Sequence, residues 1–89
     1  MKIVFTKHAE AKLLSKESVK LRINKRIIRE VIKKPFVVDK KVNPHQSIGK
    51  LNDDLSLSVI WKIANSKAKV VTFYPAAKDR YESKILRGR

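Results

Sequence analysis

The spacing of apolar residues changes at Pro35, and this change most limits the folds open to the 89-residue chain. Before it, four apolar residues recur at helical intervals, namely Ile27, Ile28, Val31 and Ile32. After it, every odd position from Leu55 to Ile63 is apolar, which is typical of a strand with one face in a core. Helices followed by strands predict an α+β domain.

The expected elements follow from local start and stop signals. A strand at 1–5 leads to Thr6, an N-cap for a helix from about Lys7, and Asn24 caps a second helix that ends before Pro35. The later segments are expected as strand 36–42, loop NPHQS at 43–47, and strands 48–51, 55–63 and 68–74, the last stopped by Pro75. We therefore predict two N-terminal helices packed on one face of a small antiparallel sheet, in a single domain covering residues 1–89.

The same patterns predict which side chains share a face. The first helix is expected to turn three residues towards the core, namely Ala9, Leu13 and Leu14. Its opposite side carries His8 and Lys12. Simple alternation in the last strand predicts that Val70 shares a face with Thr72 and Tyr74. His8 and Lys12 are thus expected outside the core.

The charge balance points to a polyanionic partner. Lys and Arg number 22 against 8 Asp and Glu, which gives a formal net charge of +14 and a pI near 10.4. Nucleic acid is the commonest partner of such a domain, with anionic lipid surfaces and acidic proteins as competitors. Half of the basic residues precede Pro35 and half follow it, which indicates a basic surface on the folded body rather than a basic tail.

The composition also excludes several classes of site. Because the chain has no cysteine, it can form neither a disulfide nor a thiolate zinc site, and no thiol can act as a nucleophile. With two histidines far apart in the sequence, we expect no metal and no cofactor. No apolar run approaches the ~20 residues that span a bilayer, and the start MKIVFTKHA lacks the apolar segment of a signal peptide. We therefore expect a cytoplasmic protein without a membrane partner.

A basic stripe is expected on the second helix. Its members are Arg22, Arg26, Arg29 and Lys33. A solvated surface is the ordinary explanation of such a stripe, and phosphate binding is the functional one. Further candidate contacts to nucleic acid are Lys62, Lys78, Tyr81 and Lys84, with Tyr81 offering a ring for base stacking. Both interpretations of the stripe stay open at this point.

Four segments together resemble a known group of proteins. They are FTKHAEAKL at 5–13, IKKP at 32–35, SIGKL at 47–51 and VVTFYPAAKDRYESK at 70–84. In this order they resemble small prokaryotic families of unknown function with the pattern F-T-x-H-A, I-x-x-P, G-[KR] and T-x-Y-P, which are grouped with the RelE/ParE-like toxin superfamily. The resemblance implies two N-terminal helices on a small antiparallel sheet. The link LSKESVKLR at 14–22 is longer than the Arg-Gly-Ile connection typical of these families.

The resemblance implies RNA cleavage in some relatives, topoisomerase poisoning in others, and no assigned activity in many. Metal-free RNA cleavage needs a base for the 2′-hydroxyl, cations around the phosphate and an acid for the leaving oxygen. The candidate catalytic residues are His8, Lys12, Thr72, Tyr74 and Arg80. In this scheme His8 is the base or acid and Lys12 holds the phosphate, provided that the last strand lies against the first helix. The plain alternative for His8 is an inert surface histidine.

Other polar residues are expected to have ordinary roles. His45 is expected in a loop, Trp61 in the core, and the adjacent acids Asp53 and Asp54 in a turn. Three functions then remain open. The first is a basic RNA-binding, RelE-like protein, a metal-independent endoribonuclease toxin or a relative of one; the second is a non-catalytic nucleic-acid-binding module; the third is a toxin-derived protein-binding domain. The candidate partners are RNA, free or on the ribosome, an acidic antitoxin protein, and a second copy of the chain as a homodimer.

Overall fold

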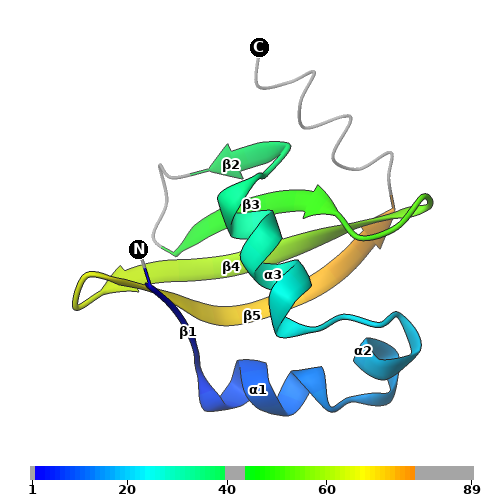
Figure 1. Ribbon diagram of the computed structural model, residues 1–89, viewed down its shortest axis with the longest axis horizontal. Helices are drawn as coiled ribbons and strands as arrows, with labels where there is room; N and C mark the ends of the chain where they lie inside the picture. Colours follow the sequence, from blue (N-terminus) through cyan, green and yellow to red (C-terminus); the bar gives the residue numbers. More distant parts are fainter. Residues whose placement is uncertain (1, 40–43, 78–89) are drawn as a thin grey trace.

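Five strands and three helices form within residues 2–39 and 44–77, the part of the chain that the computed structural model describes (Figure 1). In chain order they are β1 (Lys2–Phe5), α1 (Lys7–Leu13), α2 (Lys16–Lys20), α3 (Lys25–Lys33), β2 (Val37–Asp39), β3 (His45–Lys50), β4 (Leu55–Ala64) and β5 (Lys67–Ala77). No helix of the described segments is long and apolar enough to cross a membrane.

The five strands make one mixed sheet in the order β1-β5-β4-β3-β2. β1 runs parallel to β5, whereas the pairs β2 with β3, β3 with β4 and β4 with β5 are antiparallel. The prediction of an antiparallel sheet carrying two helices on one face was therefore wrong. Short turns join β3 to β4 and β4 to β5, which are antiparallel pairs, but a parallel pair needs a long crossover. The crossover from β1 to β5 is the rest of the described chain, and no local sequence signal gives its direction.

The helices also differ from the expected pair. α3 covers one face of the sheet, whereas α1 lies beside β5 at the edge of the sheet (Figure 1). The long link between them folds as α2, for which Ser15 is the N-cap and accepts a hydrogen bond from the backbone N–H of Ser18 at 3.2 Å. Because α1 ends at Leu13, Leu14 leaves the predicted apolar side and its side chain is 82% exposed.

α3 starts and packs as its sequence predicts. The Asn24 side chain accepts a hydrogen bond from the backbone N–H of Ile27 at 2.9 Å, which satisfies one of the free donors at the helix start. Ile28 and Val31 are buried against the sheet. Close contact with β3 depends on Gly49, because a Cβ atom there would lie 3.1 Å from Cγ2 of Val31.

The face of the sheet under α3 holds the core. Leu57, Val59 and Trp61 are buried there, which confirms the predicted core face of β4, although Ile63 at the end of the strand is 56% exposed. The serines between them were predicted on an open face, which was wrong, because Ser56 and Ser58 are buried as well. The Trp61 indole N–H donates to the Ser47 hydroxyl at 2.8 Å. The predicted loop NPHQS was wrong from His45 onwards, because β3 starts at that residue. The ring of His45 packs edge-on against Trp61 with centroids 4.8 Å apart.

A β-bulge in β5 separates side chains that simple alternation would put together. Ile60 is opposite Thr72 and Trp61 is opposite Val70, so Val71 is an extra residue in the ladder. Val70 and Phe73 are consequently both buried in the core. The prediction that Val70 shares a face with Thr72 was wrong, because the bulge turns Thr72 to the opposite side. We call that side, opposite α3, the far face; it also carries Tyr74 and Lys62.

β5 continues past its expected end at Pro75. Among the described strands, β1 pairs only with residues 67–70 of β5, so the later part of β5 has β4 as its one strand neighbour there and forms a sheet edge. An edge strand tolerates a proline because one side of its backbone needs no ladder hydrogen bond. Pro75 therefore lies inside the strand, opposite Leu57.

Candidate functional site

The Thr72 hydroxyl is the meeting point of the first helix and the last strand. Lys12 Nζ of α1 donates to Thr72 Oγ1 at 3.4 Å, and His8 Nε2 lies 3.4 Å from the same oxygen. The candidate site required the last strand to lie against the first helix, and this condition is met for these three residues. We call His8, Lys12 and Thr72 the Thr72 cluster.

The start of α1 is fixed to the bulge of β5. The backbone N–H of Thr6 donates to the Val70 carbonyl at 3.0 Å, and the Thr6 hydroxyl donates to the Val71 carbonyl at 3.2 Å. The same hydroxyl accepts from the backbone N–H of Ala9 at 3.1 Å as the predicted N-cap. Thr6 thus places the first turn of α1, with His8, next to the strand that carries Thr72.

The ammonium group of Lys12 has two neighbours on β5. Its Nζ lies 5.3 Å from the centre of the Phe73 ring, in addition to its bond with Thr72. A cation over an aromatic face gains electrostatic attraction from the ring. The half-buried Lys12 is therefore held at the sheet edge, while His8 beside it is exposed. An imidazole, an ammonium and a hydroxyl around one point can all donate to the oxygens of one phosphate.

Tyr74 is directed elsewhere. Its hydroxyl lies 3.2 Å from Gln46 Nε2, which donates to it, and the same amide donates to Ser58 Oγ at 2.7 Å. Ser58 is the β4 residue opposite Tyr74, and Gln46 lies on β3 beyond it. Tyr74 therefore reaches across the sheet rather than towards α1. Within the described residues, no hydrogen bond joins it to the Thr72 cluster.

Four lysines share the far face of the sheet with Thr72. Lys62 is opposite Lys69, and Lys2 is opposite Lys67. Like charges directly opposite each other in a sheet are destabilising. Within residues 2–39 and 44–77, the two ion pairs involve other lysines, Lys25 with Glu10 and Lys50 with Asp53. We call Lys2, Lys62, Lys67 and Lys69 the far-face lysines.

Sequence reasoning found only Lys62 among the far-face lysines. Lys67 and Lys69 share a face by alternation, so the pattern of the last strand could have indicated them. Lys2 joins them only because β1 pairs parallel with β5, and the sequence gives no sign of this pairing. Strand order therefore accounts for the missed Lys2, whereas Lys67 and Lys69 could have been found from local alternation.

The predicted basic stripe is divided between two settings. Arg26, Arg29 and Lys33 are exposed on α3, and the Arg29 guanidinium lies 5.7 Å from the Phe5 ring. Arg22 lies two residues before the Asn24 cap with φ of 58°, outside the helix. This stripe is on the helix-covered side of the sheet and does not join the far-face lysines.

Four of the predicted site residues lie outside the described residues, namely Lys78, Arg80, Tyr81 and Lys84. In the described part of the chain, no group of three or more His, Asp or Glu side chains is placed to hold a metal ion. Asp53 and Asp54 lie in a turn, as predicted, in which Asn52 Oδ1 accepts from the backbone N–H of Asp54 at 2.9 Å.

Comparison of the chain with protein-family models, curated proteins and solved structures finds no match. The resemblance to the RelE/ParE-like superfamily therefore stays a prediction.

Proposed function

We propose that this chain binds RNA, with one backbone phosphate held by the Thr72 cluster. The observation that carries the proposal is that Lys12 Nζ and His8 Nε2 both lie 3.4 Å from Thr72 Oγ1. Cations and hydroxyls placed side by side are the usual protein groups that contact phosphate. The exposed imidazole and the ammonium would face the anion, and Thr72 would position both.

The far-face lysines support the same proposal. They lie on the face that carries Thr72, and two of them, Lys62 and Lys69, are directly opposite each other. A bound polyanion would relieve their mutual repulsion, because each phosphate places negative charge between like cations. The formal net charge of +14 would also speed the encounter with RNA.

The test is the affinity for a fluorescein-labelled single-stranded RNA of about 12 nucleotides, a length within the range of single-strand site sizes. Fluorescence anisotropy measures this affinity over a series of salt concentrations. We expect log affinity to fall linearly with log salt concentration, with a slope of about −0.7 for each phosphate neutralised. Lys12→Gln should weaken binding and make the slope less steep by about 0.7, the value for one phosphate contact. Lys16→Gln, on the exposed start of α2, is the matched control. Salt-independent binding, or equal effects of both variants, would contradict the proposal.

RNA cleavage is the second candidate function, and the exposed imidazole of His8 at the cluster favours it. In this reaction His8 would remove the proton from a 2′-hydroxyl, whose oxygen attacks phosphorus and expels the 5′ oxygen. The products would be a 2′,3′-cyclic phosphate and a 5′-hydroxyl end. Within the described residues the second titratable group at Thr72 is Lys12, which the proposal assigns to holding the phosphate, so the leaving oxygen would take its proton from water and binding is the primary proposal.

Incubation with RNA in EDTA separates binding from cleavage. Cleavage that is lost in His8→Ala, retained by a Lys16→Gln control, and blocked by a 2′-deoxy substitution in the RNA would establish the endoribonuclease. RNA that is bound but stays intact would leave the non-catalytic module. His8→Gln, which keeps a hydrogen-bond donor but no base, should still bind RNA and should not cleave it.

We include in this proposal the expectations from the sequence about relatives, location and partners. They are the relation to RelE/ParE-like toxins, a cytoplasmic location, an acidic antitoxin, ribosomal RNA as a target and a homodimer. An acidic protein partner would compete with RNA for the far-face lysines, because both ligands use the same charges. A protein-binding role without RNA would show as tight binding to such a partner by a chain that leaves RNA unbound.

A further inference from the structure

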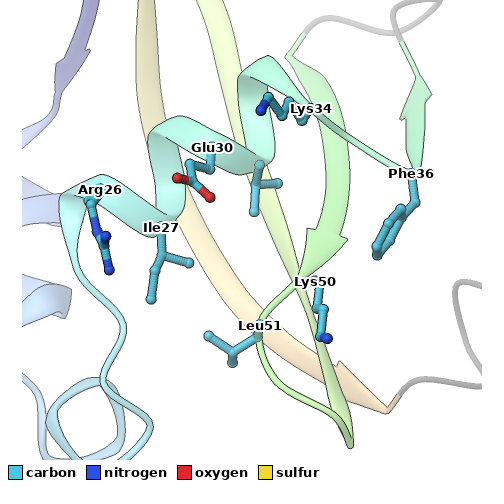
Figure 2. A pocket seen from close by; sticks show the side chains of 8 residues that line it. Arg26, Ile27, Glu30, Lys34, Phe36, Lys50 and Leu51 are labelled. Carbon is cyan, nitrogen blue, oxygen red and sulfur yellow. The ribbon is translucent and has the colours of Figure 1, made fainter.

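A groove of about 450 Å³ lies between α3 and the end of β3, on the side of the sheet that α3 covers (Figure 2). Its floor is formed by the apolar side chains of Ile27, Val31 and Leu51. Figure 2 shows Arg26 at one end of the groove and Phe36 with Lys50 at the other. We call it the α3 groove. Its volume lies within the range of about 300–1,000 Å³ typical of ligand sites.

The backbone of the surrounding elements builds this groove. Gly49 lets α3 approach β3, since its missing Cβ leaves room for Val31. The backbone N–H of Phe36 donates to the Ile48 carbonyl at 2.8 Å, which fixes Phe36 at its end of the α3 groove. The backbone N–H of Leu51 donates to the Leu55 carbonyl at 3.1 Å and closes the turn between β3 and β4. Backbone hydrogen bonds to β3 and β4 therefore hold the groove residues Phe36 and Leu51 in place.

The groove combines an aromatic ring with cations and one carboxylate. The Phe36 side chain is 49% exposed, although the residue is apolar. Three cationic side chains line the groove, Arg26, Lys34 and Lys50, against the single lining carboxylate of Glu30. Lys50 is also ion-paired with the exposed Asp53 at 3.4 Å, outside the lining. In Figure 2 the Glu30 carboxylate lies between Arg26 and the end that carries Phe36. The groove thus offers a stacking surface, phosphate contacts and one hydrogen-bond acceptor.

We propose that the α3 groove binds one unpaired nucleotide of RNA, an inference that rests on RNA binding as proposed above. The base would stack on the Phe36 ring, the flanking phosphates would contact Lys34 and Lys50, and Glu30 would accept a hydrogen bond from the base edge or the ribose 2′-hydroxyl. This contact depends on the base, whereas the Thr72 cluster and the far-face lysines contact phosphate alone.

An acidic peptide is the competing occupant, and two features disfavour it. A helix has a diameter of about 10 Å, so the groove holds roughly a single turn of one, too little for a stable peptide contact. Glu30 would also repel the carboxylates of such a peptide inside the groove, whereas it can accept hydrogen bonds from a nucleotide.

The experiment compares two strands with equal numbers of phosphates. One is a single-stranded oligoadenylate of about ten nucleotides, within the range of single-strand site sizes, and the other is an abasic ribose-phosphate strand of the same length. We expect the wild-type chain to bind the base-containing strand about tenfold more tightly. Phe36→Ala should remove that difference and leave the affinity for the abasic strand unchanged. Phe36→Trp should retain the preference, because it keeps a stacking ring.

Val38→Ala is the matched control, since Val38 is another exposed apolar residue close by on β2, 39% exposed. It should retain the base preference, and circular dichroism should show all variants folded. A second variant, Lys50→Gln, should weaken binding of both strands equally, since it removes a charge and leaves the ring.

The remaining outcomes distinguish failure of the nucleotide groove from failure of RNA binding. Equal wild-type affinity for the two strands would overturn the nucleotide groove and leave RNA binding standing. Failure to bind either strand would overturn both proposals. Binding of a Glu- and Leu-rich peptide that Phe36→Ala abolishes, with the base preference unchanged, would assign the groove to a protein partner and refute the nucleotide.

Discussion

Lys62 on β4 and Lys69 on β5 are directly opposite each other on the far face of the sheet. Their side chains carry like charges at a spacing at which cross-strand pairs interact most strongly. Lys2 and Lys67 repeat the arrangement one strand over. A sheet that tolerates two such pairs has a charge pattern suited to an anion on this face.

Reversing one charge of the pair should separate stability from binding. In Lys62→Glu, repulsion with Lys69 becomes attraction, so we expect the free energy of unfolding to rise by about 0.2–1 kcal/mol. RNA affinity should fall at the same time, because a phosphate contact is lost and a negative charge is added. Urea denaturation and anisotropy measure the two effects. Lys16→Glu on α2 should leave RNA affinity unchanged, and a less stable Lys62→Glu variant would count against the arrangement.

Thr72→Val should keep the fold and weaken the Thr72 cluster. Valine has nearly the shape of threonine and favours strands, but it has no hydroxyl to accept from Lys12. The loss of one such hydrogen bond is worth about 0.5–1.5 kcal/mol, so we expect RNA to bind roughly two- to tenfold more weakly. Thr72→Ser should recover most of the affinity. If Thr72→Val bound RNA as the wild type does, the cluster would have no part in binding.

Gly49→Ala should destabilise the chain by overpacking. The added Cβ would lie 3.1 Å and 3.3 Å from the two Cγ atoms of Val31, and 3.4 Å from its Cα. Inserting a methyl group into a well-packed contact typically costs about 1–3 kcal/mol. Chemical denaturation should show this loss, and the double variant with Val31→Ala should lose less than the sum of the two single variants. Additive losses would mean that the two residues do not compete for space.

Thr6→Ala should affect both stability and RNA binding, although Thr6 is outside the Thr72 cluster. The substitution removes the N-cap acceptor and the bond to the Val71 carbonyl, and N-cap losses cost about 0.5–2 kcal/mol. RNA should bind more weakly because α1 is no longer fixed to β5. Asn24→Ala, at the cap of α3, should cost similar stability and spare the affinity of the Thr72 cluster. Equal losses of affinity in both variants would indicate a general effect of instability.

The features that could be predicted from the sequence are those decided by neighbouring residues. Thr6 and Asn24 cap their helices through bonds to backbone groups three residues ahead, so the cap and its helix are encoded together. The alternation from Leu57 to Trp61 likewise needs no information from elsewhere. The spacing of His8 and Lys12 predicted their common side on α1 for the same reason.

The remaining features depend on residues far apart in the chain. The parallel position of β1 and the extra residue Val71 in β5 both result from pairing across strands, and neither has a local turn signal. His45 was expected in a loop because its neighbours favour turns, but packing against Trp61 places it in a strand. Of the far-face lysines, Lys2 was missed because β1 had no predicted neighbour.

The parallel pairing of β1 with β5 also sets the order in which the chain can be assembled. The bond from Thr6 to the Val71 carbonyl spans 65 residues, and closing a loop of that length costs roughly 4 kcal/mol of chain entropy. During synthesis, β1 and α1 emerge first, yet their strand partner is made after all the other described elements. His8 and Lys12 consequently have no Thr72 to contact until β5 has left the ribosome, so a nascent chain acquires its phosphate site only when the sheet is nearly complete.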